Sequence, residues 1–188
     1  MTGYILGGAA LVLAIGVIVL FNTLIAKRQM TNNGWSDIDV QLKRRADLIP
    51  QLVSTVQGYA AHERQLFADI AEKRSAALAA GDDPTKRGAA ESELTRPVGR
   101  LMAVAEAYPD LKASGNFLEL QNALSDTEDK IEMARRFYNG AVRELNTTVE
   151  TFPSNIVAGL FGVRQRAFFE ITNAADRAVP QVNTGAAQ

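Results

Sequence analysis

A long uncharged segment at the N-terminus constrains this chain more than any other feature. Residues 4–26 contain no Asp, Glu, Lys or Arg and consist mainly of Leu, Ile, Val, Ala and Gly. At about 1.5 Å rise per residue, a helix over this segment is roughly 34 Å long, enough to cross the ~30 Å hydrocarbon core of a bilayer. We expect residues 1–28 to form a single-pass transmembrane anchor.

A cleaved signal peptide is the alternative for this segment. A signal peptide has a basic start, a shorter apolar core and a small-x-small cleavage site. Here no Lys or Arg precedes the apolar run, and the run ends in Leu24-Ile25-Ala26-Lys27-Arg28. These features favour an anchor that is retained.

The positive charges predict the orientation of the anchor. Lys27 and Arg28 follow the apolar run directly, whereas only the α-amino group precedes it. The positive-inside rule therefore predicts an N-terminus outside the cell and a cytoplasmic C-terminal domain, with Lys27 and Arg28 as candidate contacts to lipid headgroups. The cluster Lys43-Arg44-Arg45 lies roughly 25 Å further along a straight helix, beyond the ~8–10 Å Debye length, so we expect it on a solvated helix face.

One face of the predicted anchor is made of small residues. Spacings of four, three and four residues separate its members, which are Gly3, Gly7, Ala10 and Ala14. Small residues let membrane helices approach closely, so this face is a candidate for transmembrane packing and self-association. The alternative is that Gly and Ala are simply common in membrane helices.

Composition excludes several kinds of site. The chain has no cysteine, which excludes disulfides, thiolate metal ligands and cysteine nucleophiles. Its one histidine, His62, cannot supply the Glu-x-x-His motifs that a ferritin-like di-iron centre needs on two helices, and Tyr59 occupies the glutamate position. A formal charge of −1 is unlike the basic surfaces that bind nucleic acid. We therefore expect no enzyme activity, cofactor, metal or nucleic-acid partner.

Apolar residues recur at helical spacing after the anchor and predict helices throughout. The first helix is expected to continue from the anchor to about residue 80, with a kink or short break near Pro50 or Gly58. Gly81-Asp82-Asp83-Pro84 ends it and starts a second helix, at about residues 85–108. A third long helix is expected at about residues 116–151.

These amphipathic helices must bury their apolar faces against one another, which predicts an all-α fold with an antiparallel bundle over residues 29–177. Residues 155–176 are expected to return as a shorter, partly helical element, and residues 178–188 to form a disordered tail. On an up–down–up path, the third helix would end far from the anchoring membrane.

The richest aromatic region follows the third predicted helix and is a candidate interaction surface. Its members are Phe152, Pro153, Phe161, Arg164, Arg166, Phe168 and Phe169. They could pack on the bundle, contact another subunit or insert into lipid. The up–down–up path favours the first two of these over docking on the same bilayer.

Three ordered groups of motifs cover most of the chain. The longest is Ala134-Arg135-Arg136-Phe137-Tyr138-Asn139-Gly140-Ala141-Val142-Arg143, followed by Asn146, Phe152-Pro153-Ser154-Asn155, Ala158, Phe161-Gly162 and Phe168-Phe169-Glu170. Upstream lie Trp35, Ile38-Asp39-Val40-Gln41-Leu42-Lys43-Arg44-Arg45, Asp47-Leu48-Ile49-Pro50-Gln51-Leu52-Val53, Val56, Gly58-Tyr59-Ala60 and His62-Glu63. Between them are Tyr108-Pro109-Asp110-Leu111-Lys112-Ala113, Asn116-Phe117, Leu120-Gln121, Leu124 and Thr127-Glu128. Together with the anchor, these motifs resemble the LemA family of bacterial membrane proteins.

The resemblance implies a four-helix-type antiparallel bundle of long, coiled-coil-like helices on an anchor in the inner (cytoplasmic) membrane. The family has no agreed activity, but a member that resembles this chain is associated with formation of magnetosome membranes in magnetic bacteria. Two functions therefore stay open: a self-associating scaffold that organises membrane lipids or membrane proteins, and an adaptor for one dedicated membrane partner, such as a protease or signalling protein. An enzyme is the third and least favoured reading.

Overall fold

A computed structural model of the chain describes residues 1–171, and over these residues the protein is all-α. No strand is present in this part of the chain, which confirms the predicted fold class. The helices are α1 (Thr2–Gln57), α2 (Arg64–Ala79), α3 (Pro84–Glu106), α4 (Pro109–Lys112), α5 (Gly115–Glu150) and α6 (Ser154–Leu160).

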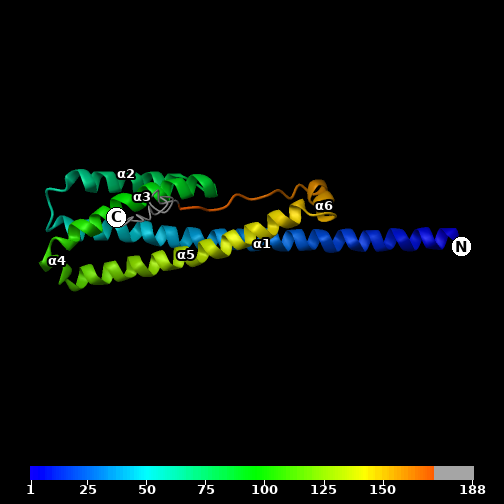
Figure 1. The fold of residues 1–188 in the computed structure, drawn as a ribbon, viewed down its shortest axis with the longest axis horizontal. Helices are drawn as coiled ribbons and strands as arrows, with labels where there is room; N and C mark the ends of the chain where they lie inside the picture. The colour runs from blue at the N-terminus through cyan, green and yellow to red at the C-terminus, as the bar shows by residue number, and fades with distance from the viewer. Residues whose placement is uncertain (172–188) are drawn as a thin grey trace, which may run out of the picture.

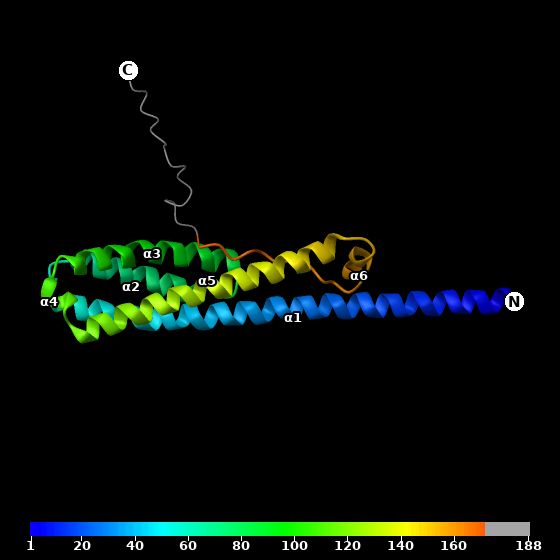
Figure 2. The ribbon, with the colours of Figure 1, turned by 60° about the horizontal axis from the view of Figure 1, so that its bottom comes forward.

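The long helices form an antiparallel bundle on one half of α1 (Figure 1). In both views, α5 runs back along α1, and α2 and α3 pack as a hairpin beside the C-terminal half of α1 (Figure 2). The N-terminal part of α1 extends beyond the rest of the molecule. At 56 residues and ~1.5 Å per residue, α1 is about 84 Å long, so it serves both as anchor and as bundle helix.

The break in the first predicted helix is a full reversal at Gly58, whereas Pro50 lies inside α1. A proline inside a helix leaves the carbonyl four residues earlier without its N–H partner. Here that carbonyl belongs to Ala46, and it accepts a hydrogen bond of 2.5 Å from Arg74 Nε on α2. Because α2 supplies the missing donor, α1 continues through the proline.

The reversal at Gly58 changes the position of the C-terminal helices relative to the anchor. It divides the first predicted helix into α1 and α2, so the bundle has four long helices and α5 returns toward the anchor. The prediction that the third helix ends far from the membrane is therefore wrong. The C-terminal end of α5 and the whole of α6 lie beside the segment of α1 that follows Val19.

Buried residues follow a heptad repeat along the α1–α5 contact, as in an antiparallel coiled coil. On α1 they include Leu24, Thr31, Ile38, Arg45 and Leu52. On α5 they include Phe117, Leu124, Ile131, Tyr138 and Leu145. The two helices come closest at Gly34, where an added Cβ would lie 3.0 Å from the Phe137 ring and 3.1 Å from Tyr138 Cα.

Three apolar cores lie along the molecule. The distal core joins α1, α2, α3 and α5 and includes Leu52, Leu94 and Leu101, all buried. The middle core surrounds Ile38 and Tyr138, and the proximal core joins Leu24 of α1 to Leu145 of α5. The proximal core thus attaches the end of the bundle to the anchor helix.

Of the element predicted for residues 155–176, the structure describes residues 155–171, and these are helical only in α6. Residues 163–171, which we call the strap, are extended and run back along the bundle toward α3 (Figure 1). The predicted tail at residues 178–188, and the last residues of the predicted bundle, lie outside the described part of the chain.

Candidate functional site

The strap is held by side chains of α5 that bond its main chain. Asn139 Nδ2 donates to the Phe169 carbonyl at 3.0 Å, and Asn139 Oδ1 accepts from the Phe169 N–H at 2.9 Å. Asn146 repeats this pairing with Arg166, at 2.9 Å for both bonds. An amide side chain offers an N–H donor and a C=O acceptor side by side, which is the pairing that one peptide unit of an extended chain needs.

The spacing of the two asparagines matches the strap. Asn139 and Asn146 are seven residues apart on a helix, about 10.5 Å at ~1.5 Å per residue. Their partners, Arg166 and Phe169, are three residues apart in extended chain, about 10 Å at ~3.3 Å per residue. The helix therefore presents a two-rung ladder in register with an extended peptide.

Side chains fix the position of the strap between helices. Phe169 is fully buried, with its ring 5.6 Å from that of Trp35, which in turn lies 5.5 Å from the Tyr138 ring. The Tyr138 hydroxyl donates to the Ala167 carbonyl at 2.8 Å. Burial raises the pKa of Tyr138, so the phenol keeps the proton that it donates.

A glycine on α3 lets the strap approach that helix. An added Cβ at Gly88 would lie 2.3 Å from the Glu170 carbonyl oxygen, a distance that no side chain can take. The strap is therefore built into a surface made by three helices: α1 through Trp35, α5 through its asparagines, and α3 through Gly88.

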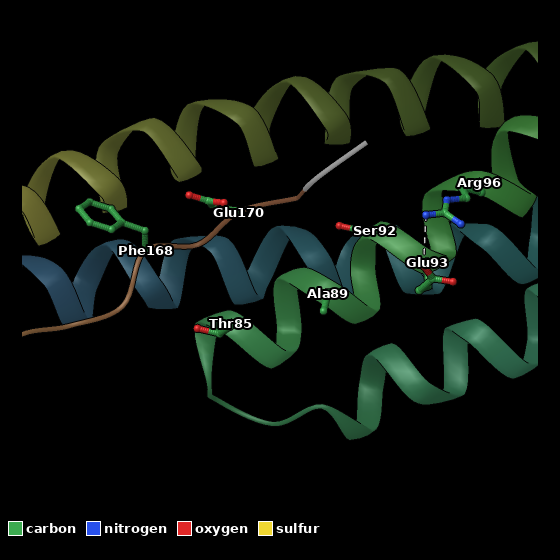
Figure 3. Close-up of a pocket in the computed structure, with 7 residues that line it drawn as sticks. All are labelled: Thr85, Ala89, Ser92, Glu93, Arg96, Phe168 and Glu170. Carbon is green, nitrogen blue, oxygen red and sulfur yellow. Dashed lines mark ion pairs between the residues drawn. The ribbon is translucent and has the colours of Figure 1, made fainter. Parts of the chain in front are cut away.

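An open trough of about 530 Å³ lies between the strap and α3 (Figure 3). Its lining residues are Thr85, Ala89, Ser92, Glu93, Arg96, Phe168 and Glu170. Arg96 and Glu93 form an ion pair of 3.4 Å along one wall. The described residues hold no group of His, Asp and Glu that could bind a metal ion. The trough is thus lined by an ion pair, a further carboxylate from the strap, two hydroxyl side chains and one aromatic ring.

Buried charges join three helices close to the end of the strap. Arg45 of α1, 3% exposed, pairs with Glu91 of α3 at 2.6 Å and with Glu128 of α5 at 2.9 Å. Glu91 also pairs with Arg87 at 2.9 Å. The prediction that Lys43-Arg44-Arg45 lies on a solvated helix face is therefore wrong at Arg45. Buried pairs of this kind recover little net energy, but Arg45 and Glu91 each have two partners, so the loss of one pair leaves a counterion in place.

The aromatic region predicted as an interaction surface divides into two parts. Phe169 and Arg166 belong to the strap, and Arg166 also reaches Asn32 Oδ1 at 3.1 Å. Phe168 lines the trough. Phe152 and Phe161 lie at the other end, beside α6, and are 75% and 52% exposed. Pro153, next to Phe152, and Arg164, in the strap, are exposed as well, so the predicted residues form no single surface.

The α6 end of the molecule lies against the anchor helix. Leu24 is fully buried in the proximal core, where α6 contributes Val157 and Ala158. The Phe21 and Phe161 rings are 4.5 Å apart. Two features were not predicted from the sequence: the paired hydrogen bonds of Asn139 and Asn146 to the strap, and the exposed apolar residues of α6. A run without charges at residues 151–163 is the signal that could have drawn attention to α6.

The first part of the anchor, residues 1–19, stands free in the described structure. Its most apolar 18-residue window is entirely unburied, and the helix is long and apolar enough to cross a membrane. Gly3 and Gly7 have no atom of another element within 4 Å of an added Cβ. Lys27 pairs with Glu144 of α5 at 2.9 Å, and Arg28 is half-buried beside it.

Three proteins with similar sequences indicate the family of this chain. The Magnetosome protein MamQ 2 of Paramagnetospirillum magneticum is 25% identical over 185 residues, which cover 85% of this chain and 68% of that protein. The Magnetosome protein MamQ of Magnetospirillum gryphiswaldense is 24% identical, covering 94% and 78%. Protein LemA of Metamycoplasma hominis is 29% identical over 149 residues, covering 79% and 68%.

The spanning helix and these relatives indicate a membrane-anchored protein. The sequence model of the LemA family matches residues 34–183, which include the strap, its asparagines and the buried charges. The match covers most of the chain and confirms the resemblance seen in the motifs. This chain belongs to the LemA family.

Proposed function

We propose that this protein is a non-enzymatic scaffold that self-associates in the inner membrane and organises the membrane or its proteins. The observation that carries the proposal is the continuity of α1, which runs unbroken from the apolar segment through all three cores. Because one helix belongs to both parts, the bundle cannot reorient freely relative to the anchor. Molecules that associate through the anchor would therefore hold their bundles in a fixed arrangement.

The orientation that we propose follows from the charges at the end of the apolar segment. Lys27 and Arg28 lie on the bundle side of the apolar segment, and the positive-inside rule then favours a cytoplasmic bundle and an N-terminus outside. Arg28 is half-buried and Lys27 is paired with Glu144, so both are held near the predicted headgroup level, where they can contact anionic lipid.

The proposed contact between copies is the small-residue face of the anchor. Residues 2–19 pack on no other part of the described chain, so a close-packed partner for this segment would come from another molecule. Names of relatives support a role in membranes, since two of the proteins described above are magnetosome proteins.

The test is the native mass of the full-length chain in mild detergent. Gly7→Leu combined with Ala10→Leu adds bulk to the small-residue face, and a large, defined assembly should fall to the monomer. The matched control is Gly8→Leu combined with Gly16→Leu, which adds the same bulk on the opposite side of the same helix. A monomer before any substitution would refute self-association, and equal loss in both variants would refute the assigned face.

An adaptor function is the second candidate, and the trough between strap and α3 favours it. A surface that already seats one extended segment, with open volume beside it, can receive a segment of a membrane protein partner. A photo-crosslinking residue at Ala89, on the trough, should yield one dedicated partner in cells, whereas the same residue at exposed Asn122 of α5 should not. Identical products at both positions would count against the adaptor.

A further inference from the structure

We infer that α6 and its flanking residues insert into the surface of the same bilayer that α1 crosses. The protein then meets one leaflet twice, once through its spanning helix and once through this short interfacial element. The inference rests on α1 crossing the membrane but not on self-association. It reverses the preference drawn from the sequence, which placed this region far from the bilayer.

An uncharged sequence combined with several exposed large apolar side chains sets this segment apart from the rest of the bundle. Residues 151–163 contain no charged side chain, and Glu150 and Arg164 bound them. The side of α6 that faces α1 packs in the proximal core. Outside this core, large apolar side chains stay open, with exposed fractions of 75% for Phe152, 55% for Ile156 and 75% for Leu160, and Phe161 is still 52% exposed although it meets Phe21 of α1.

The position of α6 along α1 places these side chains at the edge of the hydrocarbon. A ~30 Å core needs about 20 helical residues, so a span that starts at Tyr4 reaches about residue 23. Phe21 falls within that span, and the Phe161 ring lies 4.5 Å from the Phe21 ring, tilted by 50°. Residues 2–19, the part that nothing covers, give only about 27 Å of helix. The membrane therefore needs the part of α1 that α6 covers.

Neighbouring groups fit this level in the membrane. Lys27 and Arg28 are one to two turns beyond Phe21, where headgroup phosphates lie above the hydrocarbon edge. Gly162 has a φ of +65°, a left-handed conformation that turns the chain out of α6 and into the strap. The chain can thus dip to the membrane at α6 and leave it again at once.

Lipid is the occupant that these observations favour over a protein. The exposed apolar side chains of α6 are continuous with the uncovered apolar surface of α1, since Phe161 touches Phe21. Any protein that covered α6 would have to lie partly in the membrane beside the anchor. Aromatic and branched aliphatic side chains at this depth are what interfacial helices insert between acyl chains.

The absence of cysteine makes the test direct, because single cysteines can be introduced and spin-labelled in the otherwise unchanged full-length chain. Leu160→Cys and Ile156→Cys report on α6, Leu11→Cys on the span, and Val40→Cys, 61% exposed on the bundle part of α1, on water. The labelled chains are placed in vesicles of phosphatidylcholine and phosphatidylglycerol. Collision rates with oxygen, which partitions into lipid, and with a water-soluble nickel chelate are then measured.

We expect the ratio of the oxygen collision rate to the nickel collision rate to be several-fold higher for labels at Leu160 and Ile156 than for the label at Val40. The label at Leu11 should show a similarly high ratio. A ratio at Leu160 equal to that at Val40 would overturn the inference while leaving the anchor intact. Protection at Leu160 from both reagents would also overturn it, since a second copy or another protein would then be the occupant. A water-exposed Leu11 label would overturn the membrane span itself, and with it the proposed scaffold.

Discussion

The sharpest consequence of the structure concerns the strap and Asn139. Asn139→Ala removes two hydrogen bonds to the main chain of Phe169 in a half-buried site. At ~0.5–1.5 kcal/mol for each net hydrogen bond, the strap should lose about 1–3 kcal/mol of its hold on the bundle. The effect should stay local, because α5 keeps its own helix and its heptad contacts with α1.

Amide hydrogen exchange of the full-length chain in mild detergent measures this loss. The Phe169 N–H is itself bonded to Asn139 Oδ1, so its exchange reports opening of the strap. At ~1.4 kcal/mol for each factor of ten, the exchange rate of this amide should rise roughly 5- to 150-fold. The amides of α5 should keep their rates.

The control is Asn122→Ala, an exposed asparagine on the same helix, which should leave the strap unchanged. If Asn139→Ala and Asn122→Ala gave the same Phe169 exchange rate, the asparagine ladder would not be what holds the strap. If Asn139→Ala raised exchange over the whole of α5, its role would be in the stability of the bundle and the local argument would fail.

Three further changes test the packing, each by chemical denaturation of the full-length chain. Gly34→Ala puts a methyl group against a ring and a backbone and should cost about 1–3 kcal/mol, whereas Gly140→Ala, which meets nothing, should stabilise by up to ~1 kcal/mol. Phe169→Ala should cost about 3–5 kcal/mol, as for other buried aromatic residues. Arg45→Met should cost less than the ~3–5 kcal/mol of a fully unpaired buried charge, because Glu91 keeps Arg87 as a counterion, and adding Glu91→Leu should lower stability further, because buried Arg87 then loses Glu91.

Helix positions could be predicted well because the signals for them are local. The turn sequence Gly81-Asp82-Asp83-Pro84 ends one helix and starts the next, and Asp83 indeed caps α3 by accepting from the Thr85 and Lys86 N–H groups. The expected bounds of 85–108 and 116–151 lie close to those of α3 and α5. Such signals require only the residues beside the boundary.

The choice between Pro50 and Gly58 could not be made locally. Proline is the stronger helix breaker in isolation, yet α1 passes through Pro50 because Arg74, on another helix, serves the carbonyl that the proline leaves open. Gly58, a weaker signal, ends α1 without the left-handed conformation that usually marks a glycine cap. The deciding contact lies 28 residues away in the chain.

The extended conformation of the strap could not be predicted from local sequence signals either. Residues 155–176 carry apolar side chains that suit a helix, and only the first seven described residues from Ser154 form one. Over residues 166–169, the main chain bonds to asparagines 20 and 30 positions earlier instead of to itself. The partner of Asn139 and Asn146 is thus an extended segment and not a neighbouring helix.

The number of chain reversals explains why missing the turn at Gly58 changed the functional interpretation of the C-terminal region. Each tight connection between long helices reverses the direction of the chain relative to the anchor, so an odd number of helices ends far from the membrane and an even number ends beside it. The turn at Gly58 converts three predicted helices into four. It therefore moves α6 and its exposed apolar side chains from the far end of a rod to the level of Phe21. In water, these side chains would form an exposed apolar patch without an explanation. At the level of Phe21, lipid would cover them.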